Sequence, residues 1–150
     1  MRCVQQSNRW SCLPTAFAIA TDHSVQEILR RIGHDGSEIV WPDLPDPQCR
    51  RSFHVQECIL AIADWYYVMP LDQPAMMTPD GKRILEIKTR AMDFIVDGYG
   101  VCTGTGTRNR HAVAFQGNGQ TIRFYDPNGL EYDFENQYFT PQTYWLISEK

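Results

Sequence analysis

The sequence predicts a single α+β domain over residues 1–150, with helices in the N-terminal half and an antiparallel sheet in the C-terminal half. Before residue 97, apolar residues recur at intervals of three and four, which is typical of helices that bury one face. From Tyr99 onward, short β-rich runs alternate with glycine and proline, which is typical of strands joined by turns. A chain of 150 residues with 43% hydrophobic content is large enough to bury one core.

The helices expected from these intervals span residues 12–21, the segment between Ser24 and Gly33, residues 53–66 and residues 83–96. Pro14 is tolerated in the opening turn of the first helix. Ser24 and Glu27 have the spacing of a capping box, and Gly33 is suited to ending a helix. Prolines predict surface loops over residues 34–51 and 70–79.

Strands are expected over residues 99–105, 111–116, 120–126, 131–134 and 143–147. Asn118-Gly119 is typical of a two-residue hairpin loop, and it lies midway between His111 and Asp126. Such a loop places these two residues directly opposite each other, with Cβ atoms about 4.5–5.5 Å apart. In this register Val113 faces Phe124, so the polar pair shares the apolar face of the hairpin. An alternative is that His111 only caps a strand edge and Asp126 only starts an Asp-Pro-Asn-Gly turn.

Charge and cysteine content exclude several classes of protein. The net charge of −4 and the absence of a basic cluster argue against nucleic-acid binding. No apolar stretch approaches the roughly 18 residues of a membrane span, so we expect no membrane partner and a cytoplasmic location. Five cysteines are an odd number, which favours reduced thiols. Cys49, His54 and Cys58 lack the paired spacing and fourth ligand of a zinc site, so we expect no metal.

Cys12 lies six residues after Gln6 and at the N-terminus of the first expected helix, where the helix dipole favours an anionic thiol. Further along, the run from His111 to Phe115 is followed by an Asp-Pro pair at Asp126. Together these segments resemble the papain-like cysteine peptidases, most closely the peptidase C39 group and its stand-alone relatives. The resemblance spans nearly the whole chain but depends on four positions. Leu13 departs from the small residue common after the nucleophile.

The resemblance implies a papain-like fold, in which an N-terminal nucleophile helix packs on a C-terminal antiparallel sheet. It implies that Cys12 is the nucleophile, that His111 accepts its proton, that Asp126 orients His111, and that Gln6 donates to the oxyanion. The implied activity is a thiol hydrolase that cleaves peptide or isopeptide bonds of a protein or peptide substrate through a thioester. This chemistry requires no cofactor.

Residues near the expected site predict the walls of a substrate cleft. The glycine-rich segment before His111 carries Arg108 and Arg110, which we expect to contact substrate together with Trp10. Two alternatives remain open. The same triad could perform another acyl transfer, such as transglutamination, deamidation or amidase action, because an amine or water can resolve a thioester. The chain could also be an inactive binding module in which Leu13 occludes the cleft.

Overall fold

A mixed α+β arrangement is seen in the computed structural model, whose described residues are 1–43, 49–72, 98–107 and 109–150. The helices within these residues are α1 (Cys12–Thr21), α2 (Val25–Ile32) and α3 (Val55–Ile62). The strands are β1 (Ile39–Trp41), β2 (Cys49–Arg50), β3 (Tyr66–Asp72), β4 (Gly98–Thr105), β5 (Arg110–Gly117), β6 (Ile122–Tyr125), β7 (Glu131–Asp133) and β8 (Thr140–Glu149). Helices therefore precede an antiparallel sheet, as the sequence predicts.

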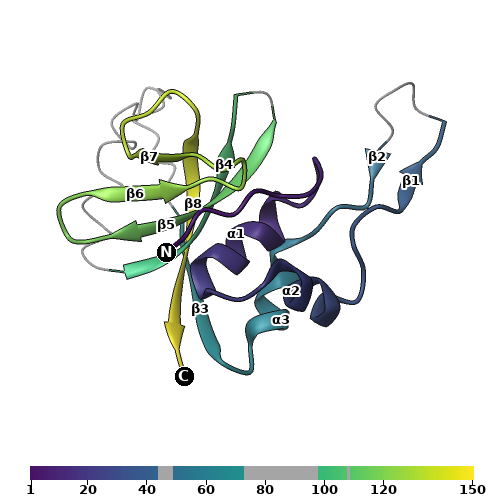
Figure 1. Ribbon diagram of the computed structural model, residues 1–150, viewed down its shortest axis with the longest axis horizontal. Helices are drawn as coiled ribbons and strands as arrows, with labels where there is room; N and C mark the ends of the chain where they lie inside the picture. The colour runs from purple at the N-terminus through teal and green to yellow at the C-terminus, as the bar shows by residue number, and fades with distance from the viewer. Residues whose placement is uncertain (44–48, 73–97, 108) are drawn as a thin grey trace, which may run out of the picture.

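Six strands form one antiparallel sheet in the order β3-β8-β4-β5-β6-β7. The helices gather on one side of this sheet, and the short β1–β2 hairpin projects away from them (Figure 1). Within the described residues, no helix is long and apolar enough to cross a membrane.

The sheet buries apolar side chains on both faces. Side chains alternate along β5, so Ala112 and Ala114 belong to the cluster that α1 packs against, where their small size lets the helix approach closely. Val113 and Phe115 belong to a second cluster on the opposite face. In that cluster the Phe115 ring meets the Tyr144 ring edge to face, with ring centroids 5.1 Å apart. Strand β5 is thus covered on both sides, which holds its first residues in a fixed position.

The first two helices have the predicted bounds, and local capping explains those of α2. Helix α1 begins at Cys12. At the start of α2 the Ser24 hydroxyl accepts a hydrogen bond from the Glu27 backbone N–H at 3.2 Å. Gly33 ends α2 in the left-handed conformation, with φ of 92°.

The region after the second helix differs from the prediction in two places. Helix α3 ends at Ile62 instead of residue 66, and Tyr66 begins β3, a strand that the sequence does not predict. Strand β3 pairs with β8 along its whole length, so a partner far away in the sequence determines its conformation. The expected loop over residues 34–51 contains β1 and β2. The helix expected over residues 83–96 lies outside the described residues.

The β5–β6 hairpin is shifted by two residues from the predicted register. Phe124 pairs with Phe115, not with Val113. The reason is the Asn118 side chain, whose Oδ1 accepts hydrogen bonds from the backbone N–H groups of Gln120 and Thr121, at 3.0 and 2.9 Å. The turn is therefore centred one residue later than Asn118-Gly119. As a result, His111 and Asp126 are not directly opposite each other.

Candidate active site

The N-terminal segment brings Cys12 to the end of the sheet where β5 starts and β6 ends. Gln5 forms an isolated antiparallel bridge with Asn128, and the Gln6 backbone N–H donates to the Pro127 carbonyl at 2.7 Å. These contacts attach the segment to the turn that begins at Asp126. The chain then enters α1, whose first residue is the partly exposed Cys12.

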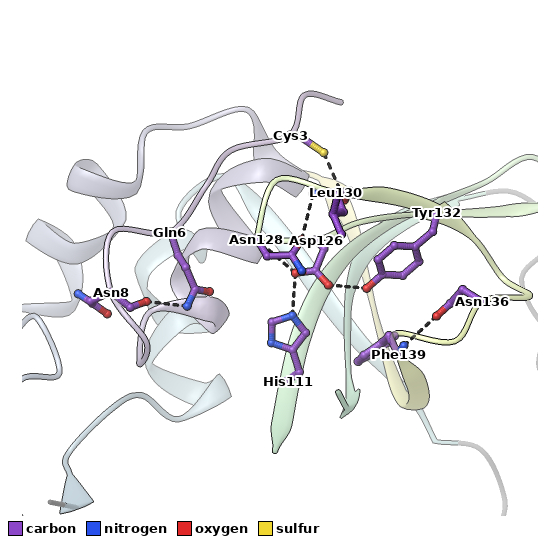
Figure 2. A network of polar contacts seen from close by, with 10 residues as sticks. All are labelled: Cys3, Gln6, Asn8, His111, Asp126, Asn128, Leu130, Tyr132, Asn136 and Phe139. Carbon is purple, nitrogen blue, oxygen red and sulfur yellow. Dashed lines mark hydrogen bonds and ion pairs between the residues drawn. The ribbon is translucent and has the colours of Figure 1, made fainter. Parts of the chain in front are cut away.

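His111 and Asp126 are in contact although the predicted register is wrong. The Nε2 atom of His111 lies 2.7 Å from Oδ1 of Asp126 (Figure 2). The two-residue shift makes them diagonal neighbours across the hairpin, a separation that long side chains can span. Asp126 also begins the turn that ends at Leu130, so it both contacts His111 and starts the predicted turn.

The Asp126 carboxylate is almost completely buried, with 2% of its surface exposed, and both of its oxygens are hydrogen-bonded. Oδ1 also accepts the Asn128 backbone N–H at 2.9 Å, and Oδ2 accepts the Tyr132 hydroxyl at 2.5 Å (Figure 2). Burial alone would raise the pKa of Asp126, but the bonds from His111, Tyr132 and Asn128 outweigh it and lower that pKa below its usual value. Asp126 is therefore ionised at neutral pH.

His111 is a charged group at neutral pH. Burial favours the neutral imidazole, but hydrogen bonds and charge interactions with Asp126 and Cys12 outweigh burial and raise the pKa of His111 to about 9. Because Nε2 is occupied by Asp126, Nδ1 is the ring atom left to interact with Cys12. Phe139 contacts the ring edge to face, at 6.2 Å between centroids, which limits its rotation.

Gln6 lies beside this pair, and its side-chain amide makes one hydrogen bond. Its Nε2 donates to the Asn8 backbone carbonyl at 2.6 Å, which leaves one N–H of the amide free (Figure 2). Its Oε1 is buried and has no partner among the described residues. The Asn8 side chain also accepts hydrogen bonds from the Trp10 backbone and the Ser11 hydroxyl, so this residue fixes the loop that precedes α1.

One cleft of about 390 Å³ brings together the four residues predicted to be catalytic, Gln6, Cys12, His111 and Asp126. The segment before His111 forms one wall, as expected, and contributes Gly106, Thr107, Asn109 and Arg110. The other described lining residues are Arg9, Asn128 and Tyr138, none of which was predicted from the sequence to line the cleft. For Arg9 a signal was available, since it lies between Gln6 and Cys12. Tyr138 gave no such signal.

The remaining residues expected near the cleft are placed differently. Trp10 does not line it: the indole N–H donates to the Asp35 carbonyl at 2.9 Å, and the Arg50 guanidinium lies 4.4 Å from the ring centroid. Arg108 lies outside the described residues. Leu13, the second residue of α1, packs against the core and is not a lining residue, so it does not occlude the cleft.

The other cysteines lie outside the cleft, and none of the five, all of which are described, forms a disulfide. Cys58 and Cys102 are buried, and burial raises the pKa of each thiol. Cys49 is exposed, and Cys3 contacts the Leu130 carbonyl. Across the described part of the chain, no three His, Cys, Asp or Glu side chains are grouped so that they could hold a metal ion.

The chain matches no protein-family model and no curated protein. The cleft that holds Cys12, His111 and Asp126 is therefore the observation from which a function can be inferred.

Proposed function

We propose that this protein is a thiol hydrolase that cleaves peptide or isopeptide bonds, with the papain-like fold and closest to the peptidase C39 group. One observation carries the proposal: Cys12, at the N-terminus of α1, lines the same cleft as His111, and His111 is hydrogen-bonded to the buried carboxylate of Asp126. The order of cysteine, histidine and aspartate along the chain supports it, as does a helix packed on an antiparallel sheet.

The first half of the proposed reaction forms a thioester. The proposed reaction starts from the thiolate of Cys12, which is the nucleophilic form, beside a protonated His111. The Sγ atom bonds to the substrate carbonyl carbon, and the electron pair of the C=O bond moves to oxygen. The Cys12 backbone N–H, which has no partner within its helix, and the free N–H of the Gln6 amide donate to this oxyanion. The tetrahedral species collapses, the C–N bond breaks, and the amine leaves with the proton of His111.

The second half hydrolyses the thioester. His111 is now neutral and takes a proton from a water molecule, whose oxygen attacks the acyl carbon. Collapse of the second tetrahedral species releases the carboxylic acid and restores the thiolate beside a protonated His111. Asp126 stays ionised throughout, because its role is to hold the imidazole in one orientation and to stabilise its charge.

Selective alkylation tests this proposal without a known substrate. Native protein is treated with limiting iodoacetamide from about pH 5 to about pH 8, and the modified cysteines are identified by mass spectrometry. We expect Cys12 to react well ahead of the exposed Cys49, and to keep this advantage at the acidic end. In His111→Ala the advantage should disappear. His23→Ala is the matched control, because His23 stacks on Trp65 outside the cleft.

Equal labelling of Cys12 and Cys49 that His111→Ala leaves unchanged would refute the catalytic assignment and favour an inactive binding module. If Cys12 is selectively labelled, a peptide library analysed by mass spectrometry tests hydrolysis directly. Cleavage should then occur with wild type and be lost in Cys12→Ala. Incorporation of an added amine instead of water would identify an acyl transferase.

A further inference from the structure

The cleft contains arginine side chains that nothing else in the described structure engages. Arg9 and Arg110 both line it and are exposed, and their side chains form no ion pair or hydrogen bond with any described residue. By contrast, the arginines with carboxylate partners are Arg30, Arg31, Arg51 and Arg123. Two cations without partners therefore converge on the space in front of Cys12.

Among the described residues that line the cleft, none offers a free carboxylate that could neutralise these cations. Asp126 is the one acidic residue among the described cleft-lining residues, and its two oxygens are occupied by His111, Asn128 and Tyr132. The charges of the protonated His111 and the ionised Asp126 cancel, so the excess positive charge comes from Arg9 and Arg110. The described lining of the cleft is thus positive on a protein whose net charge is −4. Such a surface raises the local concentration of anions.

We propose that the cleft binds a carboxylate group of its substrate, close to the acyl carbon that Cys12 attacks, and that Arg9 and Arg110 recognise this group. The inference rests on the proposed function and adds the substrate class: an acidic peptide, in which the carboxylate belongs to an Asp or Glu side chain or to a free C-terminus. A guanidinium suits this task, because its planar N–H groups match the two oxygens of a carboxylate.

Two alkylating reagents that differ in one charge test the proposal. Iodoacetate carries a carboxylate next to the reacting carbon, whereas iodoacetamide is neutral. The rate of Cys12 alkylation by iodoacetate, divided by the rate with iodoacetamide, is compared with the same ratio for N-acetylcysteinamide in the same buffer. We expect the ratio for Cys12 to exceed the reference at least severalfold. Raising NaCl from about 0.01 M to about 1 M should reduce the excess, because the Debye length falls from roughly 30 Å to roughly 3 Å.

Arginine variants separate the contribution of the two guanidinium groups from that of His111. Arg9→Gln and Arg110→Gln should each lower the ratio of the iodoacetate rate to the iodoacetamide rate roughly threefold to tenfold. Arg2→Gln is the matched control, because Arg2 is also exposed and without an ion pair but lines a different pocket. Unchanged melting temperatures show that the variants are folded.

Protection experiments identify the source of the carboxylate. Acetyl-Gly-Glu-Gly-amide carries only a side-chain carboxylate, acetyl-Gly-Gln-Gly carries only a terminal one, and acetyl-Gly-Gln-Gly-amide carries neither. Slower labelling of Cys12 by iodoacetamide in the presence of either acid, but not of the neutral peptide, supports the proposal. Protection by all three peptides to the same degree overturns it.

Failure of this inference is distinguishable from failure of the proposed function. If Cys12 reacts selectively with iodoacetamide but shows the reference ratio with iodoacetate, the thiol is activated and the carboxylate site does not exist. The same conclusion follows if Arg9→Gln and Arg110→Gln behave like Arg2→Gln. If Cys12 shows no selectivity toward iodoacetamide, the proposed function itself is wrong.

Discussion

Replacing Tyr132 by phenylalanine removes one hydroxyl from a buried position behind His111. That hydroxyl donates to Oδ2 of Asp126, and no other described group donates to this oxygen. A hydrogen bond to a charged group contributes about 1.5–3 kcal/mol to stability. The Tyr132 ring packs against Phe124, at 5.9 Å between centroids, and phenylalanine keeps that contact. The substitution therefore tests the hydrogen bond and little else.

A loss of about 2 kcal/mol in a chain of this size lowers the melting temperature by roughly 4–8 °C. Thermal unfolding at neutral pH, followed by circular dichroism, measures this shift. Tyr138→Phe is the matched control, because Tyr138 is exposed, packs beside Tyr132 and forms no hydroxyl hydrogen bond with the described residues. If Tyr132→Phe and Tyr138→Phe melt at the same temperature, the Asp126 carboxylate does not depend on Tyr132.

The same variant has an effect that a purely structural role would not produce. The bond from Tyr132 helps to lower the pKa of Asp126, so its loss should raise that pKa. Asp126 would then become protonated at a less acidic pH, and His111 would lose its charged partner there. The rate of Cys12 alkylation at acidic pH should therefore fall in Tyr132→Phe and should stay at the wild-type value in Tyr138→Phe. Identical profiles would show that Tyr132 does not position the His111–Asp126 pair.

Two further predictions concern stability. Gly100→Ala should prevent β4 from pairing with β8, because a Cβ at this position would lie 1.9 Å from the Trp145 carbonyl oxygen. Natively folded protein with the wild-type melting temperature would contradict this prediction. The pKa of His111 is about 9 in the folded protein, against 6.5 for a free histidine. Protonated His111 therefore adds up to about 3 kcal/mol to the free energy of unfolding, which is fully present below about pH 6.5 and is lost as the pH rises through about 9. Urea unfolding should therefore show a difference between wild type and His111→Ala that is large near pH 6 and small near pH 10, and a difference independent of pH would refute the assigned charge.

Local signals made the helices around Cys12 predictable, because capping residues and apolar intervals are contained within each segment. The bonds at Ser24 and Gly33 involve neighbours three or four residues away, which any reader of the sequence can inspect. The change from α3 to β3 was not predictable in this way. Tyr66 continues the apolar interval of the helix, and only its pairing with Glu149 of β8 explains why it belongs to a strand.

The two tyrosines of the site could not be predicted from the sequence either. Tyr132 and Tyr138 come from the region around β7, and nothing in their spacing relates them to Asp126 or Cys12. They reach the site because β7 pairs with β6 and the chain then returns past His111 toward β8. Arg9 lies between Gln6 and Cys12, so a place near the cleft could be expected for it. Its significance, however, depends on its side chain having no ion-pair or hydrogen-bond partner, which only the three-dimensional arrangement of the other charged residues establishes.

The contact between His111 and Asp126 was predicted from a register that proved wrong, and the geometry of a strand explains why the contact survived. Side chains on a strand alternate with a period of two. The turn at Asn118 shifts the pairing by two residues, so both side chains stay on the face that was predicted for them. They move from directly opposite to diagonal positions, a separation that an imidazole and a carboxylate can bridge at 2.7 Å. A shift of one residue would have placed them on opposite faces of the sheet. This hairpin can therefore form the pair only if its register shifts by an even number of residues, wherever the turn is centred.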